Sequence, residues 1–499
     1  MLFSSVFSAA ASALFFSMSL VQAAPTAGGS LAVTNGDLVT FSYSTTDPNE
    51  KNWIGVYHAS GGGPVNGEKV SESLIWDWAP ANQGTLRLDV TTFEPGQYVA
   101  FFLARDGYKS LASPVNFNVP KPAPQQLSFI ISQMTLHNAR QKDAYTAKLA
   151  GLVAGGNGGV RFAKESGASW VQVSADGTLS GTPSGSDGDA NVVVSATAGG
   201  AKSTLKINIP VKKTGTPLVS QFRVMTFNLW IGGTRVNNYH NKQIKFLVES
   251  NVDIVGVQEA TGDHPKRIAN ALGWYYYSGG DLGIISRYPI VAEHGHVSAS
   301  IGVRIALDGT ATQINFWDAH LSAYPYGPYD FCVDNRDINY VIRREGESGR
   351  TQQVIDTLKA MAPQIAAANN VPVILMGDTN APSHLDWTNE ARDLHCGFGG
   401  VPWPTSVKPM EAGLIDSFRV AHPDPVAVPG NTWSPLYPFA DGATGRPEPQ
   451  DRIDIIYHAG KLAVVDSQVV FVGTPKLYGQ HQNNEWTSDH AAVITTYRL

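Results

Sequence analysis

The sequence predicts a multidomain chain in which two β-sandwich modules precede a larger α/β domain that carries the chemistry. Three observations support this prediction. The chain has 499 residues, which is more than one hydrophobic core usually organises. Short alternating runs and turns fill its N-terminal part, in keeping with 49 glycines and 30 prolines. The C-terminal part has apolar strands that end in polar residues, and it holds 11 of the 13 histidines.

The first 23 residues have the pattern of a secretory signal peptide. Ala9 to Leu20 is mostly apolar, and Val21 to Ala23 is a small-residue cleavage pattern. The apolar run is too short to span a bilayer comfortably, and no later segment is long and apolar enough. A retained anchor is the alternative, because no Lys or Arg precedes the run. We predict a secreted protein in which Cys332 and Cys396 either pair or stay free.

Residues 24–120 are predicted to form an immunoglobulin-like β-sandwich. Leu38 to Tyr43 alternates between apolar and polar residues, Tyr98 to Leu103 is a second strand-like run, and turn residues separate such runs. Three tryptophans either pack in this module, which is the commoner role, or form a face that contacts a glycan. They are Trp53, Trp76 and Trp78.

A proline-rich linker, Pro120 to Pro124, leads to a second β module at residues 125–212. Its Ser174 to Pro183 segment resembles a turn of Ig-like or cadherin-like repeats in extracellular proteins. Neither module carries a cluster of catalytic residue types. We expect both to serve as spacers or as units that target the cell surface.

Six segments between residues 220 and 499 share one pattern, an apolar strand beside Asn, Asp, Glu or His. A buried strand holds such a group rigidly at the edge of a sheet, where α/β folds commonly place their chemistry. A polar residue that caps a strand is the ordinary explanation of any single case. The six cases together favour an active site. The polar residues are Asn228, Glu259, His320, Asp378 with Asn380, Asp454, and Asp489 with His490.

These side chains suit the hydrolysis of phosphoesters. Carboxylate oxygens bind hard divalent cations such as Mg²⁺ or Mn²⁺, with Ca²⁺ as a third candidate. A cation held by one or two carboxylates keeps positions open for water and a substrate phosphate. Asn and His can donate to the non-bridging oxygens as charge develops in the transition state. The sequence lacks a G-x-S-x-G elbow, a P-loop and an HExxH helix.

The motifs of this domain resemble those of the endonuclease/exonuclease/phosphatase superfamily, which has the DNase I-like fold. They occur in the order of that family: TFNLW (226–230), DIVGVQE (253–259), DAHL (318–321), GDTN (377–380), RIDII (452–456) and SDH (488–490). The resemblance covers nearly all of residues 220–499 and is specific for the superfamily but not for a substrate. It implies a four-layer α/β sandwich, with Gly349 to Ala366 as one of the outer helices.

The resemblance also implies roles for the metal side of the site. Glu259 would be the main metal ligand, with Asn228 and Asp489 close to the metal and the phosphate. Nucleases of the family often set a second acidic residue beside the phosphate-binding histidine, and Asp281 is the candidate for that position.

On the phosphate side, the resemblance implies that His320, Asn380 and His490 contact the scissile phosphate. Asp378 would orient or deprotonate the attacking water. Asp454 would pair with His490 or assist protonation of the leaving group.

The segment from Tyr324 to Arg344 is predicted as a long, insertion-like loop after His320. Its candidate substrate-binding residues are Tyr324, Arg343 and Arg344, together with Tyr326 and Tyr329. A solvated surface loop is the alternative.

The net charge of the chain bears on which class of substrate is favoured. The chain has a net charge of −6, and residues 221–499 contain 21 Lys and Arg against 28 Asp and Glu, a net of −7. Tight binders of duplex DNA usually carry a basic face, so nucleic acid is not the favoured partner. A phosphodiester or phosphomonoester of a small molecule or lipid headgroup fits at least as well. An extracellular nuclease, a non-catalytic adhesion protein, and a lectin-like protein that acts through its β modules remain alternatives.

Overall fold

The computed structural model describes residues 28–34, 38–90, 93–119, 126–156, 159–440 and 445–499. The predicted signal peptide and the linker at residues 120–124 lie outside these ranges. The chain forms two compact units, residues 1–121 and 122–499. Within the described ranges, no helix is long and apolar enough to cross a membrane.

The first unit consists of two antiparallel sheets that enclose one core, to which Phe41, Ile54 and Phe102 contribute. Trp53 is buried, but Trp76 and Trp78 are 48% and 38% exposed. Trp53 therefore packs in the module as predicted. The partly exposed rings of Trp76 and Trp78 contact Trp53 and each other, and they leave the alternative of a glycan-contacting face open. The strands are β1 (Ser30–Thr34), β2 (Leu38–Ser44) and β5 (Gln83–Asp89), then β4 (Ile75–Trp78), β3 (Trp53–His58), β6 (Gly96–Leu103) and β7 (Val115–Val119).

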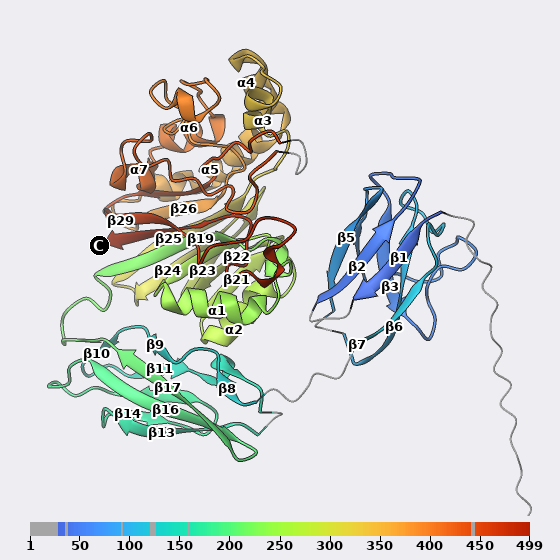
Figure 1. The fold of residues 1–499 in the computed structure, drawn as a ribbon. Helices are drawn as coiled ribbons and strands as arrows, with labels where there is room; N and C mark the ends of the chain where they lie inside the picture. Colours follow the sequence, from blue (N-terminus) through green and yellow to red (C-terminus); the bar gives the residue numbers. More distant parts are fainter. Residues whose placement is uncertain (1–27, 35–37, 91–92, 120–125, 157–158, 441–444) are drawn as a thin grey trace, which may run out of the picture. The chain divides into compact units, whose positions relative to one another are not determined.

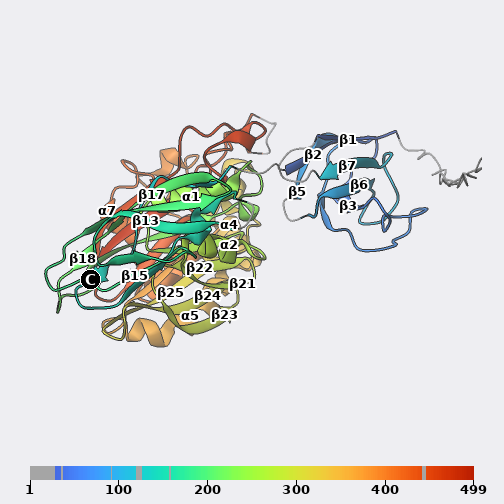
Figure 2. The ribbon, with the colours of Figure 1, turned by 90° about the horizontal axis from the view of Figure 1, so that it is seen from below.

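Residues 126–212 form a strand-rich module within the second unit. It packs beside α1 (Tyr239–Glu249) and α2 (His264–Leu272), as Figures 1 and 2 show, and shares a hydrophobic core with them. The largest sheet runs β13-β16-β17-β9. The strands are β8 (Ser128–Phe129), β9 (Gln133–Thr135), β10 (Ala139–Arg140), β11 (Tyr145–Lys148), β12 (Val153–Ala154), β13 (Arg161–Gly167), β14 (Val171–Val173), β15 (Thr178–Gly181), β16 (Ala190–Ala198), β17 (Ala201–Ile209) and β18 (Val211–Lys212).

Two six-stranded sheets pack face to face in the rest of the second unit. Their facing sides share an apolar core that includes Ile254, Ile284 and Phe316. One sheet runs β21 (Tyr275–Gly279), β22 (Leu282–Ser286), β20 (Ile254–Gln258), β19 (Gln221–Asn228), β30 (Ala492–Arg498), β29 (Ala463–Val470). The other runs β23 (Ile290–Val297), β24 (Ser300–Asp308), β25 (Thr312–His320), β26 (Val373–Asp378), β28 (Asp454–Ala459), β27 (Ile415–Asp416).

Helices cover both outer faces, so the predicted α/β sandwich of the DNase I-like type is confirmed (Figure 1). Helix α1 packs on the first sheet, where Phe246 contacts Phe227. Helix α5 (Arg350–Ala366), the predicted outer helix, packs on the second through Val354, Leu358 and Met361. The sequence places apolar residues at helical spacing on one side of α5, which explains its burial.

The segment predicted as a long loop after His320 is mostly helical. It contains α3 (Gly327–Cys332) and α4 (Ile338–Glu347). Asp337 caps α4, because its carboxylate accepts hydrogen bonds from two backbone N–H groups at the start of that helix. A disulfide between Cys332 and Cys396 ties α3 to the loop after β26. The remaining helices are α6 (Pro404–Glu411) and α7 (Ser417–Ala421).

Candidate active site

The polar residues at the ends of the strands come together on one side of the sandwich, where strand ends of the two sheets lie close to each other. In the second sheet His320, Asp378 and Asp454 lie side by side in register on β25, β26 and β28. In the first sheet Asn228 ends β19, and its Nδ2 reaches across to Asp378 Oδ2 at 3.1 Å. The pocket at this edge has a volume of about 310 Å³. The predicted site residues that line it are Glu259, His320, Tyr324, Tyr326, Tyr329, Asp378, Asn380, Asp489 and His490.

His490 and Asp454 form a buried ion pair on one side of the pocket. His490 Nδ1 lies 2.9 Å from Asp454 Oδ2, and both side chains are almost fully buried. Burial disfavours a charged imidazole, but the neighbouring carboxylates outweigh this effect and raise the pKa of His490 well above its ordinary value. The second ring nitrogen, Nε2, faces Asp378. The pair therefore fixes the His490 ring with Nε2 toward Asp378 beside the pocket.

His320 and Asp281 form a second pair on the other side. His320 Nδ1 lies 2.6 Å from Asp281 Oδ2. Burial works against the charge on His320, but Asp281 and then Asp378 raise its pKa to about 9. The same contact lowers the pKa of Asp281, against the effect of its own partial burial. Asp281, the candidate for the second acidic residue, thus lies beside the predicted phosphate-binding histidine.

Asp378 is the central carboxylate of the pocket. Its Oδ2 lies 3.6 Å from Nε2 of His320 and 3.8 Å from Nε2 of His490, and its Oδ1 accepts a hydrogen bond from the backbone N–H of Asn380. Burial raises the pKa of Asp378, although His490 opposes the shift. A carboxylate in this position can orient a water molecule or accept its proton.

Glu259 and Asp489 form the acidic end of the site. Glu259 Oε2 accepts from the backbone N–H of Ile231 at 2.8 Å, and Oε1 accepts from Asn228 Nδ2 at 3.2 Å. Asp489 Oδ1 is buried without a hydrogen-bond partner. Burial and the charge of Glu259 raise the pKa of Asp489 to about 7, against the effect of His490. An unpartnered buried carboxylate oxygen close to a second carboxylate fits a divalent cation.

A second group of potential metal ligands lies deeper. One ligand atom each of Asp378, Asp454 and His490 falls within 4.8 Å of the others. An imidazole must be neutral to bind a metal. His490 would join this set only in its neutral form, and the three residues are a second candidate set of ligands beside the pair of Glu259 and Asp489.

The structure separates the predicted substrate-binding residues. Tyr324, Tyr326 and Tyr329 line the pocket, but Arg343 and Arg344 do not. Both arginines lie on α4, where Arg344 Nε is 3.2 Å from Asp330 Oδ2 and Arg343 is exposed near Glu347. Because this segment is helical, it carries the two arginines away from the site.

Aromatic residues from distant segments complete the pocket. Trp230 and Trp433 line it together with Tyr326 and Tyr329. The ring of Trp433 lies edge-on to His490, with 5.0 Å between centroids. Trp230 belongs to the TFNLW motif that follows β19, but no local signal in the sequence places Trp433 at the site.

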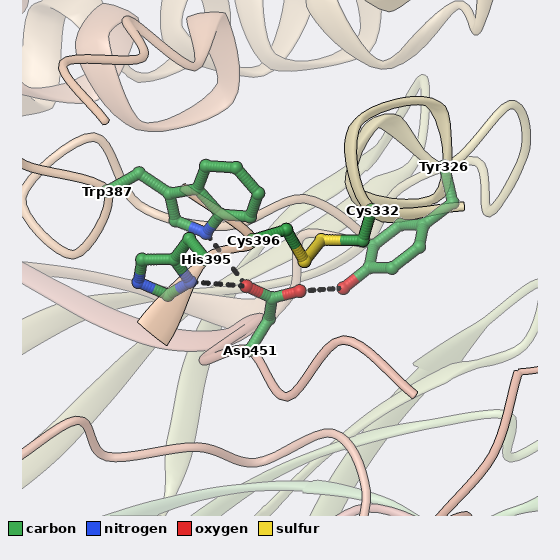
Figure 3. Close-up of a disulfide and its surroundings, with 6 residues drawn as sticks. All are labelled: Tyr326, Cys332, Trp387, His395, Cys396 and Asp451. Carbon is green, nitrogen blue, oxygen red and sulfur yellow. Dashed lines mark hydrogen bonds and ion pairs between the residues drawn. A yellow bond between two sulfur atoms is a disulfide. The ribbon is translucent and has the colours of Figure 1, made fainter. Parts of the chain in front are cut away.

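The aromatic side of the pocket rests on a buried carboxylate (Figure 3). Asp451 accepts hydrogen bonds of 2.8 Å from the hydroxyl of Tyr326 and from Nε1 of Trp387. Burial raises the pKa of Asp451 to about 7. The disulfide between Cys332 and Cys396 lies next to Asp451 and its partners. Both the hydrogen bond to Asp451 and the disulfide therefore hold the segment that carries Tyr326 in place.

Comparison with known proteins gives the family of the chain. A model of the Endonuclease/Exonuclease/phosphatase family matches residues 225–490. An uncharacterized protein of Caenorhabditis elegans is 32% identical over 290 residues, which cover 55% of this chain and 90% of that protein.

Solved structures with a similar fold include the following two. The 3'-5' exonuclease NExo from Neisseria meningitidis is 18% identical and matches 56% of this chain and 100% of its own, with a TM-score of 0.38. Truncated TDP2 from Caenorhabditis elegans is 16% identical over 56% of this chain and 98% of its own, with a TM-score of 0.36. The match of the family model shows that this chain belongs to the endonuclease/exonuclease/phosphatase family, a family of hydrolases that act on phosphoester bonds.

Proposed function

We propose that this protein is a divalent-metal-dependent phosphoesterase that cleaves phosphodiester or phosphomonoester bonds by attack of water on phosphorus. One observation carries the proposal. A single pocket brings together the central carboxylate Asp378, two histidines that are each paired with a carboxylate, and the acidic pair of Glu259 and Asp489. No motif residue of the site is replaced, which argues against a binding protein that has lost catalysis.

The mechanism follows from the charges of these groups. When bound by Glu259 and Asp489, a divalent cation supplies Lewis-acid stabilisation of negative charge on the phosphate. His320 and His490 hold protons at Nε2, facing the pocket, and we assign them to the non-bridging oxygens and the leaving oxygen. Asp378 orients the attacking water or takes its proton.

Asn380 supplies a further donor. Its Nδ2 donates to the carbonyl of Leu321 at 2.9 Å, and an amide NH₂ has a second N–H available. We assign that N–H to a phosphate oxygen. Asp454 acts through His490, because its Oδ2 holds Nδ1 and so fixes which nitrogen faces the substrate.

Export of the protein is part of the proposal. The N-terminal pattern at residues 1–23 and the disulfide between Cys332 and Cys396 both suit an oxidising, extracellular compartment. The domain boundaries at residues 24–120, 125–212 and 220–499 and the Ig-like nature of the β modules are proposals as well. Exposed Trp76 and Trp78 make a glycan contact the one specific role we propose for the first module.

Hydrolysis of bis-p-nitrophenyl phosphate and p-nitrophenyl phosphate tests the proposed function. The purified protein is assayed with Mg²⁺, Mn²⁺ or Ca²⁺ and then with EDTA. Cleavage that requires a metal supports the proposal, and the preferred ester decides between diesterase and monoesterase. A nuclease of the same family would instead cleave DNA or RNA more efficiently than either small ester. If no metal supports cleavage of any substrate, the proposal is wrong.

A further inference from the structure

The short loop at residues 230–233 follows β19 and grips Glu259, a ligand of the metal in the proposed function. The backbone N–H of Ile231 donates to Glu259 Oε2 at 2.8 Å, and the backbone N–H of Gly232 donates to the carbonyl of Glu259 at 2.7 Å. Ile231 and Glu259 both line the pocket. The position of this carboxylate therefore depends on the conformation of the loop.

The backbone of the loop has a conformation that its side chains disfavour. Trp230 and Ile231 have φ angles of 56° and 53°, in the left-handed region, and Glu259 has a φ angle of 51°. A residue other than glycine adopts this region at a cost in free energy, and a β-branched residue such as Ile231 is rarely found there. Such a conformation persists only where surrounding contacts impose it. We therefore looked for the contacts that hold this loop.

Two polar side chains from the helices on the outer face of the sheet supply these contacts, and we call them the loop clamp. Gln243 on α1 is fully buried, and its Nε2 donates to the carbonyl of Gly232 at 3.1 Å. Arg267 on α2 donates from Nη2 to Oε1 of Gln243 at 2.8 Å and to the carbonyl of Gly232 at 3.4 Å. Gly232 is thus held through its carbonyl by the loop clamp and through its N–H by Glu259.

At two glycines the backbone of the loop lies directly against side chains of the helices. A Cβ atom at Gly232 would lie 2.2 Å from Nε2 of His264. A Cβ atom at Gly233 would lie 2.2 Å from Nε2 of Gln243. His264 in turn contacts Arg267, with 3.2 Å between Nδ1 and Nη2. The loop therefore rests on a packed polar layer and cannot move toward the helices without displacing it.

We propose that Gln243 and Arg267 are positioning residues for the metal site. Through Gly232 they impose the strained conformation that directs the N–H groups of the loop at Glu259, so that the carboxylate is already oriented when a divalent cation binds. Outer-shell groups that orient a ligand in this way raise the affinity for the metal. Neither residue lines the pocket, so both act through the loop. The inference rests on the proposed function, because it requires a cation at Glu259.

The affinity of the purified protein for Mn²⁺, measured by isothermal titration calorimetry without substrate, tests the inference. Gln243→Met removes both hydrogen bonds of the side chain and keeps its length. We expect its Kd for Mn²⁺ to be about tenfold higher than that of the wild type, as for other outer-shell variants. Gln141→Met is the matched control, because Gln141 is a buried glutamine of the β module whose Nε2 donates to the carbonyl of Asp187 at 2.7 Å. The Kd of this control should equal that of the wild type.

Thermal unfolding in EDTA separates positioning from a purely structural role. Loss of a buried hydrogen bond should lower the Tm of both Gln243→Met and Gln141→Met. Only Gln243→Met should also lose affinity for Mn²⁺, and an unchanged Kd in the folded variant would overturn the inference. If Gln243→Met does not fold, Arg267→Met at a half-buried position provides the same comparison. An unchanged Kd in Arg267→Met is then the contradicting result.

Ile231→Gly tests the role of backbone strain. Glycine adopts the left-handed region without a steric penalty, so in this variant the loop keeps its shape with less help from the loop clamp. We expect Gln243→Met to weaken Mn²⁺ binding less in the Ile231→Gly background than in the wild type. A loss of the same size in both backgrounds would show that the loop clamp does not oppose strain, and this step of the inference would be wrong.

Glu259→Gln, titrated in parallel, distinguishes failure of the inference from failure of the proposed function. If Mn²⁺ binding requires Glu259 but is unaffected in Gln243→Met, only the inference is wrong. If Glu259→Gln binds Mn²⁺ as tightly as the wild type, or if the wild type binds none, the proposed metal site and the inference fail together.

Discussion

His490 donates from Nδ1 to Asp454 Oδ2 over 2.9 Å, and both side chains are closed off from solvent. This contact fixes the orientation of the ring and keeps its other nitrogen turned toward Asp378. The pairing depends on the sheet, because Asp454 and Asp378 are neighbours in register on β28 and β26.

Asp454→Asn should lower kcat by about 10²–10⁴-fold with a smaller effect on KM, because the amide no longer stabilises a charged imidazole. Steady-state kinetics on a diester measure this effect. Asp393→Asn is the control, since Asp393 is 95% exposed and outside the site. A kcat within twofold of the wild type would show that the pair is structural only.

The pair of His320 and Asp281 should make stability depend on pH. The pKa of His320 is raised to about 9 in the folded protein, so the folded state binds this proton more tightly than the unfolded state. The stabilisation is fully present below the unfolded pKa of about 6.5 and is lost as the pH rises through 9. In EDTA, the Tm should fall between pH 7 and pH 10, and Asp281→Asn should reduce that fall. An identical fall in both proteins would contradict the assignment.

Metal should stabilise the protein more strongly at higher pH. Burial, opposed by His490 and reinforced by Glu259, raises the pKa of Asp489 to about 7. Without metal, the folded state therefore gains stability when Asp489 is protonated and loses it as the pH rises through 7. Because a metal binds the deprotonated carboxylate, the increase in Tm on adding Mn²⁺ should be larger at pH 8 than at pH 5.5. Glu259→Gln should abolish most of this increase. An increase that is independent of pH would place the metal elsewhere.

The disulfide should stabilise the aromatic side of the site. Cys332 and Cys396 are 64 residues apart, and a crosslink of this length typically contributes about 2–4 kcal/mol. The double variant Cys332→Ser/Cys396→Ser should unfold at a lower temperature. It should also raise KM more than it lowers kcat, because Tyr326 and Tyr329 lie at the start of α3, which the disulfide fastens. Unchanged KM would show that Asp451 and Glu448 hold the aromatic side of the pocket without the disulfide.

The sequence predicts much of the catalytic end of the site because each predicted residue sits at the end of a strand. An apolar strand such as β26 can be recognised from its own residues. Asp378 and Asn380 follow its apolar run directly in the sequence, so their position at the end of the strand is predictable. Because these features depend on the local sequence pattern, they can be predicted without knowledge of the tertiary contacts. Asp281 lies in none of the quoted motifs, and only its contact with His320 in the folded chain places it at the site.

The substrate side depends on contacts between distant segments, and here the sequence is less informative. Proline and glycine at the start of α3 hide its helical character, so a loop is the expectation from residues 324–344. Trp433 and Glu448 meet Tyr329 only in the folded chain. The sequence suggests Arg343 and Arg344 as binders of the substrate. In the structure both lie on α4, where they pair with Glu347 and Asp330.

The most direct test of the central claim is the rate at which the Asp378→Asn protein cleaves bis-p-nitrophenyl phosphate with saturating Mg²⁺ or Mn²⁺. Circular dichroism and Tm of the variant establish that it is folded. The account predicts a folded protein whose kcat is reduced by at least about 10²-fold, because the amide cannot accept a proton from water. A folded Asp378→Asn protein with wild-type turnover would contradict the assignment of Asp378, and with it the proposed mechanism.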